Sequence, residues 1–323
     1  MPTEPAGSPA QARPPVVVIA GPTASGKSAL ATELAATFAG TIINADSLQI
    51  YRDLPILTAQ PDAAALAQAP HRLYGCLDAA ERGSVARWRD AALVEIDAAH
   101  AAARLPIVVG GTGLYLRALR DGLAEIPAVP AATRTAATVL YETLGGVAFR
   151  KELAVLDPDT AARLPPGDRQ RLIRAWEVVH ATGRPIGEWR RRTPDSAPYR
   201  FASILLSPPR EALYAACDAR FSLMIAKGAL DEVAALAARQ LNRDLPAMKA
   251  VGVPELLASL RGEVGLESAI EQAQRATRRY AKRQMTWFRH QMVADLHWNE
   301  QYLESLLRCS RHFIDHFLLT RSA

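Results

Sequence analysis

The sequence has few of the features that mark exported and membrane proteins. Among its 323 residues are three cysteines, which lie too far apart for a disulfide framework or a zinc-binding pattern: Cys76, Cys217 and Cys309. No apolar run approaches the roughly 20 residues of a membrane-spanning helix. Residues 1–14 contain four prolines, and no basic segment there is followed by an apolar one as in a signal peptide. We therefore expect a cytoplasmic protein without membrane contact, which begins with a disordered tail over residues 1–14.

Lysine is also scarce. The 38 basic residues comprise 5 lysines and 33 arginines, and the formal net charge is +5. Arginine forms bidentate hydrogen bonds with phosphate groups and stacks on bases, so this excess favours a nucleic-acid partner. A genome biased towards alanine and arginine would give the same ratio. The positions of the arginines must therefore decide between the two explanations.

One short glycine-rich motif has a strong chemical meaning. The residues Gly21-Pro22-Thr23-Ala24-Ser25-Gly26-Lys27-Ser28 fit the pattern of a phosphate-binding P-loop. They follow an apolar run, 15–20, and precede a helical stretch, 28–38, which is the context that this motif requires. Backbone N–H groups and the helix N-terminus would hold a phosphate, Lys27 would contact its terminal oxygens, and Ser28 would bind Mg²⁺. The motif predicts a bound di- or triphosphate.

Short apolar runs alternate with helical segments in the first third of the chain. Strands are predicted at 15–20, 41–46 and 106–111, and helices at 28–38, 87–104 and 114–123. This alternation predicts an α/β fold, a P-loop domain whose parallel sheet is covered by helices on both faces. Because ligands bind at the carboxyl ends of parallel strands, the P-loop, Asp46 and Gly110-Gly111-Thr112 should face one crevice.

Strand signals disappear between residues 124 and 198. Helices are predicted there at 133–144, 148–156 and 168–182. A strand at 200–206 follows, then helices at 212–228, 231–240 and 266–291, a strand at 296–298 and a helix at 302–319. We interpret the pattern as a discontinuous core domain, a helical insertion and a C-terminal helix with a tail. Their ranges are 15–123 with 199–300, 124–198 and 301–323.

Three residues outside the P-loop are candidates for chemistry, and each has an alternative interpretation. Asp46 ends an apolar strand, where a carboxylate could act as a general base or hold Mg²⁺ through water, or could cap a following helix. The run Gly110-Gly111-Thr112-Gly113 allows close backbone approach to a ligand, with Thr112 as a donor, or forms a plain turn. Arg220 alone is typical of a solvated helical arginine.

Basic residues gather in two helical segments. In the insertion, Arg171 and Arg174 share a helix face that could grip a phosphate backbone or could simply be solvated. In the last long helix, basic residues recur at a spacing of three to four between residues 275 and 289, beside Tyr280 and Trp287. This spacing predicts a basic stripe along one helix face, which could contact the phosphates and bases of a nucleic acid or could simply be solvated.

Together, these segments resemble the tRNA dimethylallyltransferase family, also called tRNA isopentenyltransferases. The resemblance covers about residues 16–298. Each motif is short, but their joint occurrence in this order is specific. Besides the P-loop, the motifs are Asp46-Ser47-x-Gln49-x-Tyr51, Pro70-His71-Arg72-Leu73, Gly110-Gly111-Thr112-x-Leu114-Tyr115, Asp168-x-Gln170-Arg171-x-x-Arg174-Ala175, Arg220-Phe221 and Lys282-Arg283-Gln284-x-Thr286-Trp287.

The resemblance implies prenyl transfer. The family moves a dimethylallyl group from dimethylallyl diphosphate to N6 of adenosine 37, on the 3′ side of the anticodon, in tRNAs that read codons starting with U. It implies Mg²⁺ as cofactor and the anticodon stem-loop of tRNA as partner, and we expect a monomer. Asp46 would be the base at N6, while Thr112, Arg220 and Lys27 would steady the diphosphate. The flipped adenine and the prenyl diphosphate would enter a channel from opposite ends.

The resemblance also implies contacts with RNA. Asp46, Ser47, Leu48 and Gln49 would line the side of the site that recognises the base. The insertion would grip the anticodon stem, and the last long helix would hold RNA from the core. The residues implied in these two segments are Arg134, Gln170, Arg171, Leu172, Ile173, Arg174, Lys282, Arg283, Gln284, Trp287 and Arg289.

Two segments depart from the family pattern. The chain has Leu57-Thr58-Ala59-Gln60-Pro61 where the family commonly has Gly-Thr-Ala-Lys-Pro. It also has Gly252-Val253-Pro254 where Gly-Tyr is common. Both departures bear on local packing and on RNA contacts near these loops.

Three other functions fit part of the sequence. A kinase with ATP in the P-loop would explain Lys27, Ser28 and Asp46, but it would leave the basic stripe and the insertion without a role. A prenyltransferase that acts on free AMP would use the same catalytic residues without gripping RNA. A non-enzymatic RNA binder with a vestigial P-loop would not need Asp46, Thr112 and Arg220.

Overall fold

The computed structural model describes residues 13–191, 196–300 and 304–320. Its contacts divide the chain into two units. The core unit comprises the described residues up to Arg120 and from Ala197 onward, and the insertion unit is Asp121–Ser196. The predicted tail 1–14 lies outside the described residues except for Arg13 and Pro14, as do residues 301–303 and 321–323 of the predicted C-terminal segment. No helix within the described ranges is long and apolar enough to cross a membrane.

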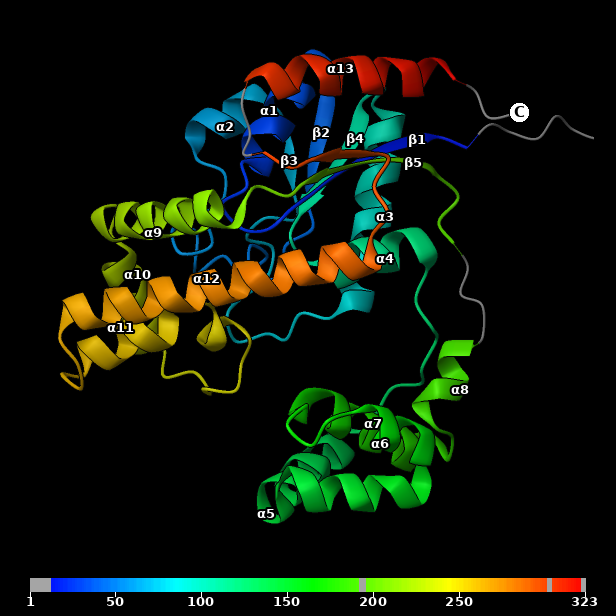
Figure 1. The fold of residues 1–323 in the computed structure, drawn as a ribbon, viewed down its shortest axis with the longest axis vertical. Helices are drawn as coiled ribbons and strands as arrows, with labels where there is room; N and C mark the ends of the chain where they lie inside the picture. Colours follow the sequence, from blue (N-terminus) through cyan, green and yellow to red (C-terminus); the bar gives the residue numbers. More distant parts are fainter. Residues whose placement is uncertain (1–12, 192–195, 301–303, 321–323) are drawn as a thin grey trace, which may run out of the picture. The chain divides into compact units, whose positions relative to one another are not determined.

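A six-stranded parallel sheet forms the centre of the core unit (Figure 1). Its strand order is β3-β2-β4-β1-β5-β6. β1 lies between β4 and β5, with Val17 opposite Ile107 and Ala202. This arrangement confirms the predicted P-loop α/β fold with a parallel sheet. The strands are β1 Pro15–Ala20, β2 Gly40–Asn44, β3 His71–Arg72, β4 Leu105–Gly110, β5 Arg200–Leu206 and β6 Leu296–Trp298.

Helices cover both faces of the sheet because alternate residues of each strand point to opposite sides. Val17 and Ile19 of β1 pack with α1 and α13, whereas Val18 packs with α3, α4 and the end of α12. α13, which belongs to the C-terminal segment, buries Ile314 in the first of these layers. The helices that cover the sheet are α1 Lys27–Thr37, α3 Val85–Ala101, α4 Gly113–Asp121 and α13 Glu304–Leu319.

A second group of helices packs beside the sheet and around the loop that follows β2 (Figure 1). Leu54 and Leu57 of this loop share a hydrophobic core with Phe221, Val253 and Ala273. This core brings residues far apart in sequence to the same loop. The elements of this group are α9 Arg210–Ala226, α10 Ala229–Ala238, the 3₁₀ helix Ala247–Lys249, α11 Val253–Leu260 and α12 Leu266–Gln291. A further helix, α2 Ala63–Gln68, follows the same loop and contacts α1.

The insertion unit is helical, and it has its own hydrophobic core around Phe149, Leu172 and Val178. The two helices predicted at 133–144 and 148–156 are the two parts of α5, which are separated by a kink at Gly145, where φ is 71°. Its helices are α5 Ala131–Leu156, α6 Pro158–Arg163, α7 Arg169–Thr182 and α8 Ile186–Arg191.

Candidate active site

The P-loop has the backbone of an anion-binding site. Gly26 precedes α1 with φ 88°, and Ala24 also has a positive φ, 63°. Such alternation of left- and right-handed residues turns successive N–H groups towards a common concavity, at the positive end of a helix. The Ser25 hydroxyl is buried beneath this loop and has no hydrogen-bond partner among the described residues. The loop is therefore built to receive an anion.

Lys27 provides a buried cation next to this concavity. Its Nζ donates a hydrogen bond to the Pro22 carbonyl at 3.2 Å. Burial lowers the pKa of Lys27 to about 8; nearby Asp46 opposes this shift, and Arg220 adds to it. An anion in the P-loop would favour the charged ammonium, so Lys27 would gain charge when a phosphate binds.

Residues from two distant helices hold the P-loop at Thr23. The Thr23 N–H donates to Oε1 of Gln284 on α12 at 2.8 Å. Gln284 Nε2 in turn donates to the Gly111 carbonyl at 2.9 Å. Arg220 on α9, whose pKa burial lowers, donates to the Thr23 hydroxyl. Arg220 lies on a helix, as predicted, and its side chain contacts the P-loop.

Asp46 is delivered by β2 and held in one orientation by its neighbours. The Asp46 N–H donates to Asn44 Oδ1 at 2.8 Å, and Asp46 Oδ1 accepts from the Leu48 N–H at 3.0 Å. Asn44 Nδ2 donates to the Leu73 carbonyl, and the Trp88 indole donates to the Asn44 carbonyl. Residues 47–50 form a turn, so the alternative of a helix cap is not what the structure shows. One oxygen of the buried carboxylate supports this turn, which leaves the other oxygen for chemistry.

Asp46, Thr23 and Arg220 line one pocket in the core unit. Leu48, Tyr280 and Thr277 contribute to its lining, and burial raises the pKa of Tyr280. Several apolar side chains complete the wall, among them Leu57, Phe221 and Met224. A pocket that combines the Arg220 guanidinium, one carboxylate and an apolar wall suits a ligand with an anionic group and a short hydrocarbon chain.

The glycine-rich turn after β4 approaches other parts of the protein closely. A Cβ on Gly110 would lie 2.1 Å from the Ala45 carbonyl oxygen, and one on Gly111 would lie 2.2 Å from Gln284 Nε2. Thr112 Oγ1 accepts from the Ser47 N–H at 2.9 Å and donates to the Ser47 hydroxyl. In the structure, these glycines make room for β2 and α12, and Thr112 supports the turn that carries Asp46. A contact between Thr112 and a diphosphate stays a prediction.

Gln49 and Ser28 line a different pocket from Asp46. Both hydrogens of the Gln49 amide are engaged, because Nε2 donates to the carbonyls of Thr58 and Ala59 at 2.9 and 2.8 Å. Ser28 is exposed on the first turn of α1. The described residues contain no group of three or more His, Cys, Asp and Glu that could hold a metal ion. Mg²⁺ commonly takes most of its ligands from water and substrate phosphates, so the exposed Ser28 hydroxyl fits as a single protein ligand.

The insertion unit exposes only some of the residues predicted to contact RNA. Arg134, Gln170 and Arg171 are exposed. Arg174 pairs with the buried Glu177 at 3.1 Å. The side chains of Leu172 and Ile173 are buried in the hydrophobic core of this unit, so a contact of these residues with RNA, which stays a prediction, would use their backbone. They lie on the inner face of the same helix.

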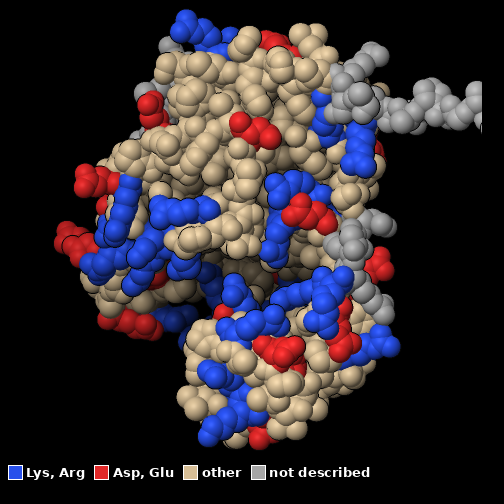
Figure 2. All heavy atoms as spheres, turned by 45° about the vertical axis from the view of Figure 1, so that its right-hand side comes forward, with Lys and Arg blue, Asp and Glu red and all other residues tan. Residues whose placement is uncertain are grey.

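The last long helix, α12, also separates into two faces. Lys282, Arg283 and Arg289 are exposed, and Figure 2 shows basic side chains gathered on a face of the core unit at the height of this helix. Gln284 is buried, and Trp287 packs over Gly113, where a Cβ would lie 2.1 Å from the indole. The Gln284 side chain therefore points into the protein, away from the exposed face of Lys282 and Arg283. Trp287 is half-exposed, and its contact with RNA stays a prediction.

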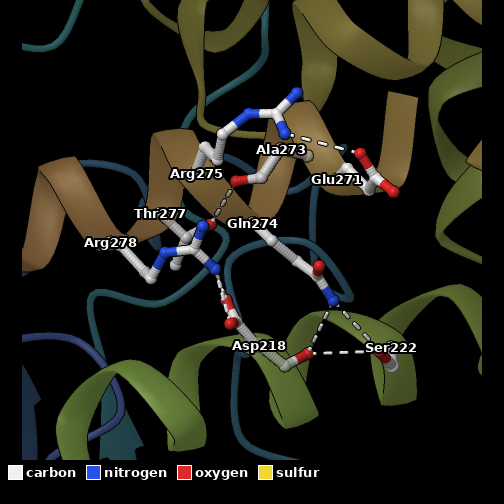
Figure 3. A network of polar contacts seen from close by, with 8 residues as sticks. All are labelled: Asp218, Ser222, Glu271, Ala273, Gln274, Arg275, Thr277 and Arg278. Carbon is white, nitrogen blue, oxygen red and sulfur yellow. Dashed lines mark hydrogen bonds and ion pairs between the residues drawn. The ribbon is translucent and has the colours of Figure 1, made fainter. Parts of the chain in front are cut away.

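Within the stripe, Arg278 is paired with another part of the protein. Its guanidinium donates to Asp218 on α9 at 2.6 Å (Figure 3). Gln274 on the same face of α12 donates to the Asp218 carbonyl and the Ser222 hydroxyl. This part of α12 holds α9 in place, and Arg220 follows Asp218 by only half a turn.

The sequence did not identify two residues that hold the site together. Asn44 holds the backbone of Asp46 through a hydrogen bond from the Asp46 N–H. The sequence signal that could have identified Asn44 is a polar amide residue at the end of an otherwise apolar strand. Glu232 on α10 accepts from the N–H groups of Ile56 and Leu57 at 2.6 and 3.0 Å. Nothing in the local sequence distinguishes Glu232 from a surface carboxylate on an amphipathic helix.

The two departures from the family pattern lie close together in the structure. Leu57 is buried in the wall of the Asp46 pocket, and Gln60 Nε2 donates to the Tyr51 carbonyl at 2.8 Å. Val253 is fully buried at the start of α11. A Cβ on Gly252, where φ is 98°, would lie 3.0 Å from Leu57 Cδ2. Both departures therefore contribute to packing around the apolar wall.

Comparison with known proteins gives one consistent family. The family model described as IPP transferase matches residues 49–291. A tRNA dimethylallyltransferase of Rhodospirillum centenum is 58% identical over 282 residues, which are 87% of this chain and 90% of that protein. One of Rhodospirillum rubrum is 52% identical over 318 residues, which are 98% of this chain and 97% of that protein.

Solved structures agree with the sequence comparisons. The full-length tRNA isopentenylpyrophosphate transferase of Bacillus halodurans has a TM-score of 0.68 and 33% identity, covering 93% of this chain and 95% of that one. A eukaryotic dimethylallyltransferase acting on tRNA has a TM-score of 0.78 and 26% identity, covering 94% of this chain and 80% of that one. The whole fold, with both units, is thus shared with such enzymes.

Proposed function

Because the chain belongs to the IPP transferase family, we propose that it is a tRNA dimethylallyltransferase. It transfers the dimethylallyl group of dimethylallyl diphosphate to N6 of adenosine 37, on the 3′ side of the anticodon, in tRNAs that read codons starting with U. The observation that carries this proposal is the pocket in which Asp46, Thr23 and Arg220 lie beside an apolar wall. A kinase would leave the basic stripe and the insertion without a role.

The leaving group is the diphosphate. The bond between allylic C1 and the bridging oxygen breaks, and the diphosphate leaves with the electron pair. Lys27, which contacts the Pro22 carbonyl, Arg220, which contacts Thr23, and the N–H groups of the P-loop would neutralise this developing charge. Because these groups are partly or fully buried, their interaction with the leaving group is stronger than it would be in water.

The nucleophile is a weak one, because the lone pair of the adenine N6 is delocalised into the ring. As the C1–N6 bond forms, N6 must lose a proton. Asp46 is the carboxylate that lines the pocket, and its orientation is fixed by the Leu48 N–H. We assign the proton to Asp46, acting as general base. The turn of Ser47 and Leu48 would face the flipped adenine.

A divalent cation, Mg²⁺ in our proposal, fits the exposed Ser28 hydroxyl together with diphosphate oxygens and water. When bound, it would add positive charge to the leaving diphosphate. We expect the enzyme to act as a monomer in the cytoplasm. Sedimentation at micromolar concentration would test the oligomeric state.

RNA binding would use exposed basic residues of both units. In the core unit these are Lys282, Arg283 and Arg289 on α12, and in the insertion unit Arg134 and Arg171. Such groups contact phosphates, position the RNA and make its affinity dependent on salt. The target adenine would leave its stack to enter the pocket, as bases do in other enzymes that modify them.

The test is mass analysis of tRNA after incubation with the protein, dimethylallyl diphosphate and Mg²⁺. We expect one dimethylallyl group on a single adenosine next to the anticodon. The same assay with free AMP as acceptor, and binding measurements with ATP, separate the alternatives. Modification of AMP but not of an anticodon stem-loop, or tight ATP binding without binding of the prenyl diphosphate, would overturn the proposal.

A further inference from the structure

We propose that Gln284 is a positioning residue for prenyl transfer, which fixes the P-loop and the turn after β4 through its side-chain amide. The proposal rests on the function proposed above, because it concerns the same site. It assigns to Gln284 a task different from that of its neighbours Lys282 and Arg283, which are exposed on the other side of α12.

Both ends of the Gln284 amide are engaged in the interior. The carbonyl accepts from the Thr23 N–H at 2.8 Å, and the amino group donates to the Gly111 carbonyl at 2.9 Å. The side chain is only 6% exposed. A contact with RNA would require the amide to abandon both partners and leave a buried N–H and a buried carbonyl unpaired, which is unfavourable.

The space at Gly111 is matched to this amide. A Cβ there would lie 2.2 Å from Gln284 Nε2, far inside any permissible contact. The glycine lets the backbone after β4 come close enough to accept the hydrogen bond. Gln284 and Gly111 therefore act as one unit, and this link is independent of the P-loop contact.

Gln284 also belongs to a network of polar contacts that links the P-loop, α9 and α12. Thr23 is held by Gln284 at its N–H and by Arg220 at its hydroxyl. Arg220 lies on α9, which the Arg278–Asp218 pair fastens back to α12 (Figure 3). α12 therefore reaches Thr23 both directly and through α9, so that the P-loop and Arg220 are fixed relative to each other.

The consequence for the reaction concerns the geometry of the diphosphate. Since the Thr23 N–H is bound to Gln284, the phosphate-binding N–H groups are those of the residues that follow it. Their direction depends on where Thr23 is held. Displacement of a reacting group by about 1 Å can cost about 100-fold in rate. Loss of the amide should thus reduce both diphosphate affinity and turnover, while RNA affinity stays the same.

The test compares Gln284→Met with a matched control, Gln272→Met. Gln272 lies on the same helix, and its amide donates only to Ser268 one turn away. Calorimetry with inorganic diphosphate, binding of an anticodon stem-loop, and single-turnover transfer are measured for each variant. We expect Gln284→Met to bind diphosphate about 10-fold more weakly, as follows from losing two hydrogen bonds. Transfer should fall about 10- to 100-fold, with stem-loop affinity unchanged; Gln272→Met should match the wild type in all three.

A second variant covers the case in which Gln284→Met does not fold. Gly111→Ala places a methyl group on the Gln284 amide, so it should reproduce the loss of diphosphate affinity. In a Gln284→Ala background the contact with the amide is gone, and the Cβ meets only the Gly21 carbonyl oxygen closely, at 3.1 Å. Gly111→Ala should therefore cost clearly less there than in the wild type, a non-additivity typical of residues in contact.

Two results would overturn the inference. One is weakened stem-loop binding by Gln284→Met with unchanged diphosphate affinity. The other is full additivity of Gly111→Ala and Gln284→Ala. Failure of the proposed function would look different, since wild-type protein would then bind diphosphate without modifying tRNA.

Discussion

At the scale of single residues, the sharpest prediction concerns Asp46. Asp46→Asn keeps an oxygen that can accept from the Leu48 N–H, so the turn should persist, but the amide cannot take the proton from N6. General-base catalysis contributes about 100- to 10,000-fold, and we expect a loss of turnover in that range. Single-turnover transfer and stem-loop binding are the measurements, with Asp90→Asn on the exposed face of α3 as control. Unchanged turnover would show that Asp46 is not the base.

Lys27 gives a prediction about pH. Its pKa is lowered to about 8 by burial, so above that pH the free enzyme has a largely neutral amine. A bound diphosphate favours the ammonium and raises this pKa again. Binding should therefore take up a proton between about pH 8 and the ordinary pKa of lysine, about 10.4, and affinity should fall as the pH rises through that window. Calorimetry at pH 9 in buffers of different ionisation enthalpy measures the proton uptake. Its absence, with affinity constant from pH 7 to 9.5, would contradict the assignment.

At the scale of helices and loops, the contact between α9 and α12 separates positioning from RNA binding. Arg278 belongs to the basic stripe by sequence, but its guanidinium is engaged by Asp218. Arg278→Met should loosen Arg220 and lower turnover about 10-fold, the effect of one charge-assisted hydrogen bond of about 1.5 kcal/mol. The salt dependence of stem-loop binding should not change. Arg289→Met should behave in the opposite way, reducing that slope by about 1 without affecting turnover at saturating RNA. Equal effects of the two variants on the slope would refute this distinction.

The loop after β2 depends on a carboxylate from α10. Glu232→Ala leaves the N–H groups of Ile56 and Leu57 without their acceptor, at a cost of about 1–3 kcal/mol in the free energy of unfolding. Because Leu57 lines the pocket, the KM for the prenyl diphosphate should rise as well. Urea denaturation and steady-state kinetics measure the two effects. Glu271→Ala is the control, since its pair with Arg275 is largely exposed and contributes little. Identical unfolding for both variants would show that the loop does not need Glu232.

The same scale shows what the sequence could and could not predict. The predicted strands and long helices agree with the structure to within a few residues, because apolar periodicity over six or more positions reflects burial on a sheet or helix face. The short helices α2, α6 and α8 were not predicted, since six residues give too few turns for a periodic signal. The helix α11 was not predicted either; it begins at Val253-Pro254, inside the segment where the chain departs from the family pattern.

At the site, residues with a motif could be predicted, whereas those defined by tertiary contact could not. Arg220 had no local signal, and the family resemblance pointed to it; the structure places it on Thr23. Gln284, Leu172 and Ile173 lie in family motifs, but their burial could not be predicted, because it depends on which helix face packs inward. A motif identifies residues that are important for function. Only the fold shows whether such a residue lines the ligand site or positions another residue that does.

At the scale of the whole molecule, we expect the two units to have separable tasks, and a charge reversal in the insertion unit tests this. Arg171 of the insertion unit has a side chain that is 71% exposed, and the residues that line the pocket around Asp46 belong to the core unit. Arg171→Glu should weaken stem-loop binding and make its salt dependence shallower by about 1, because one phosphate contact is lost. Diphosphate affinity should stay the same. Lys151→Glu, an exposed residue of the same unit with the same change in charge, distinguishes a specific contact from net charge. If both reversals weaken RNA binding equally, the insertion attracts RNA by its overall charge; if Arg171→Glu also weakens diphosphate binding, the two units do not act independently.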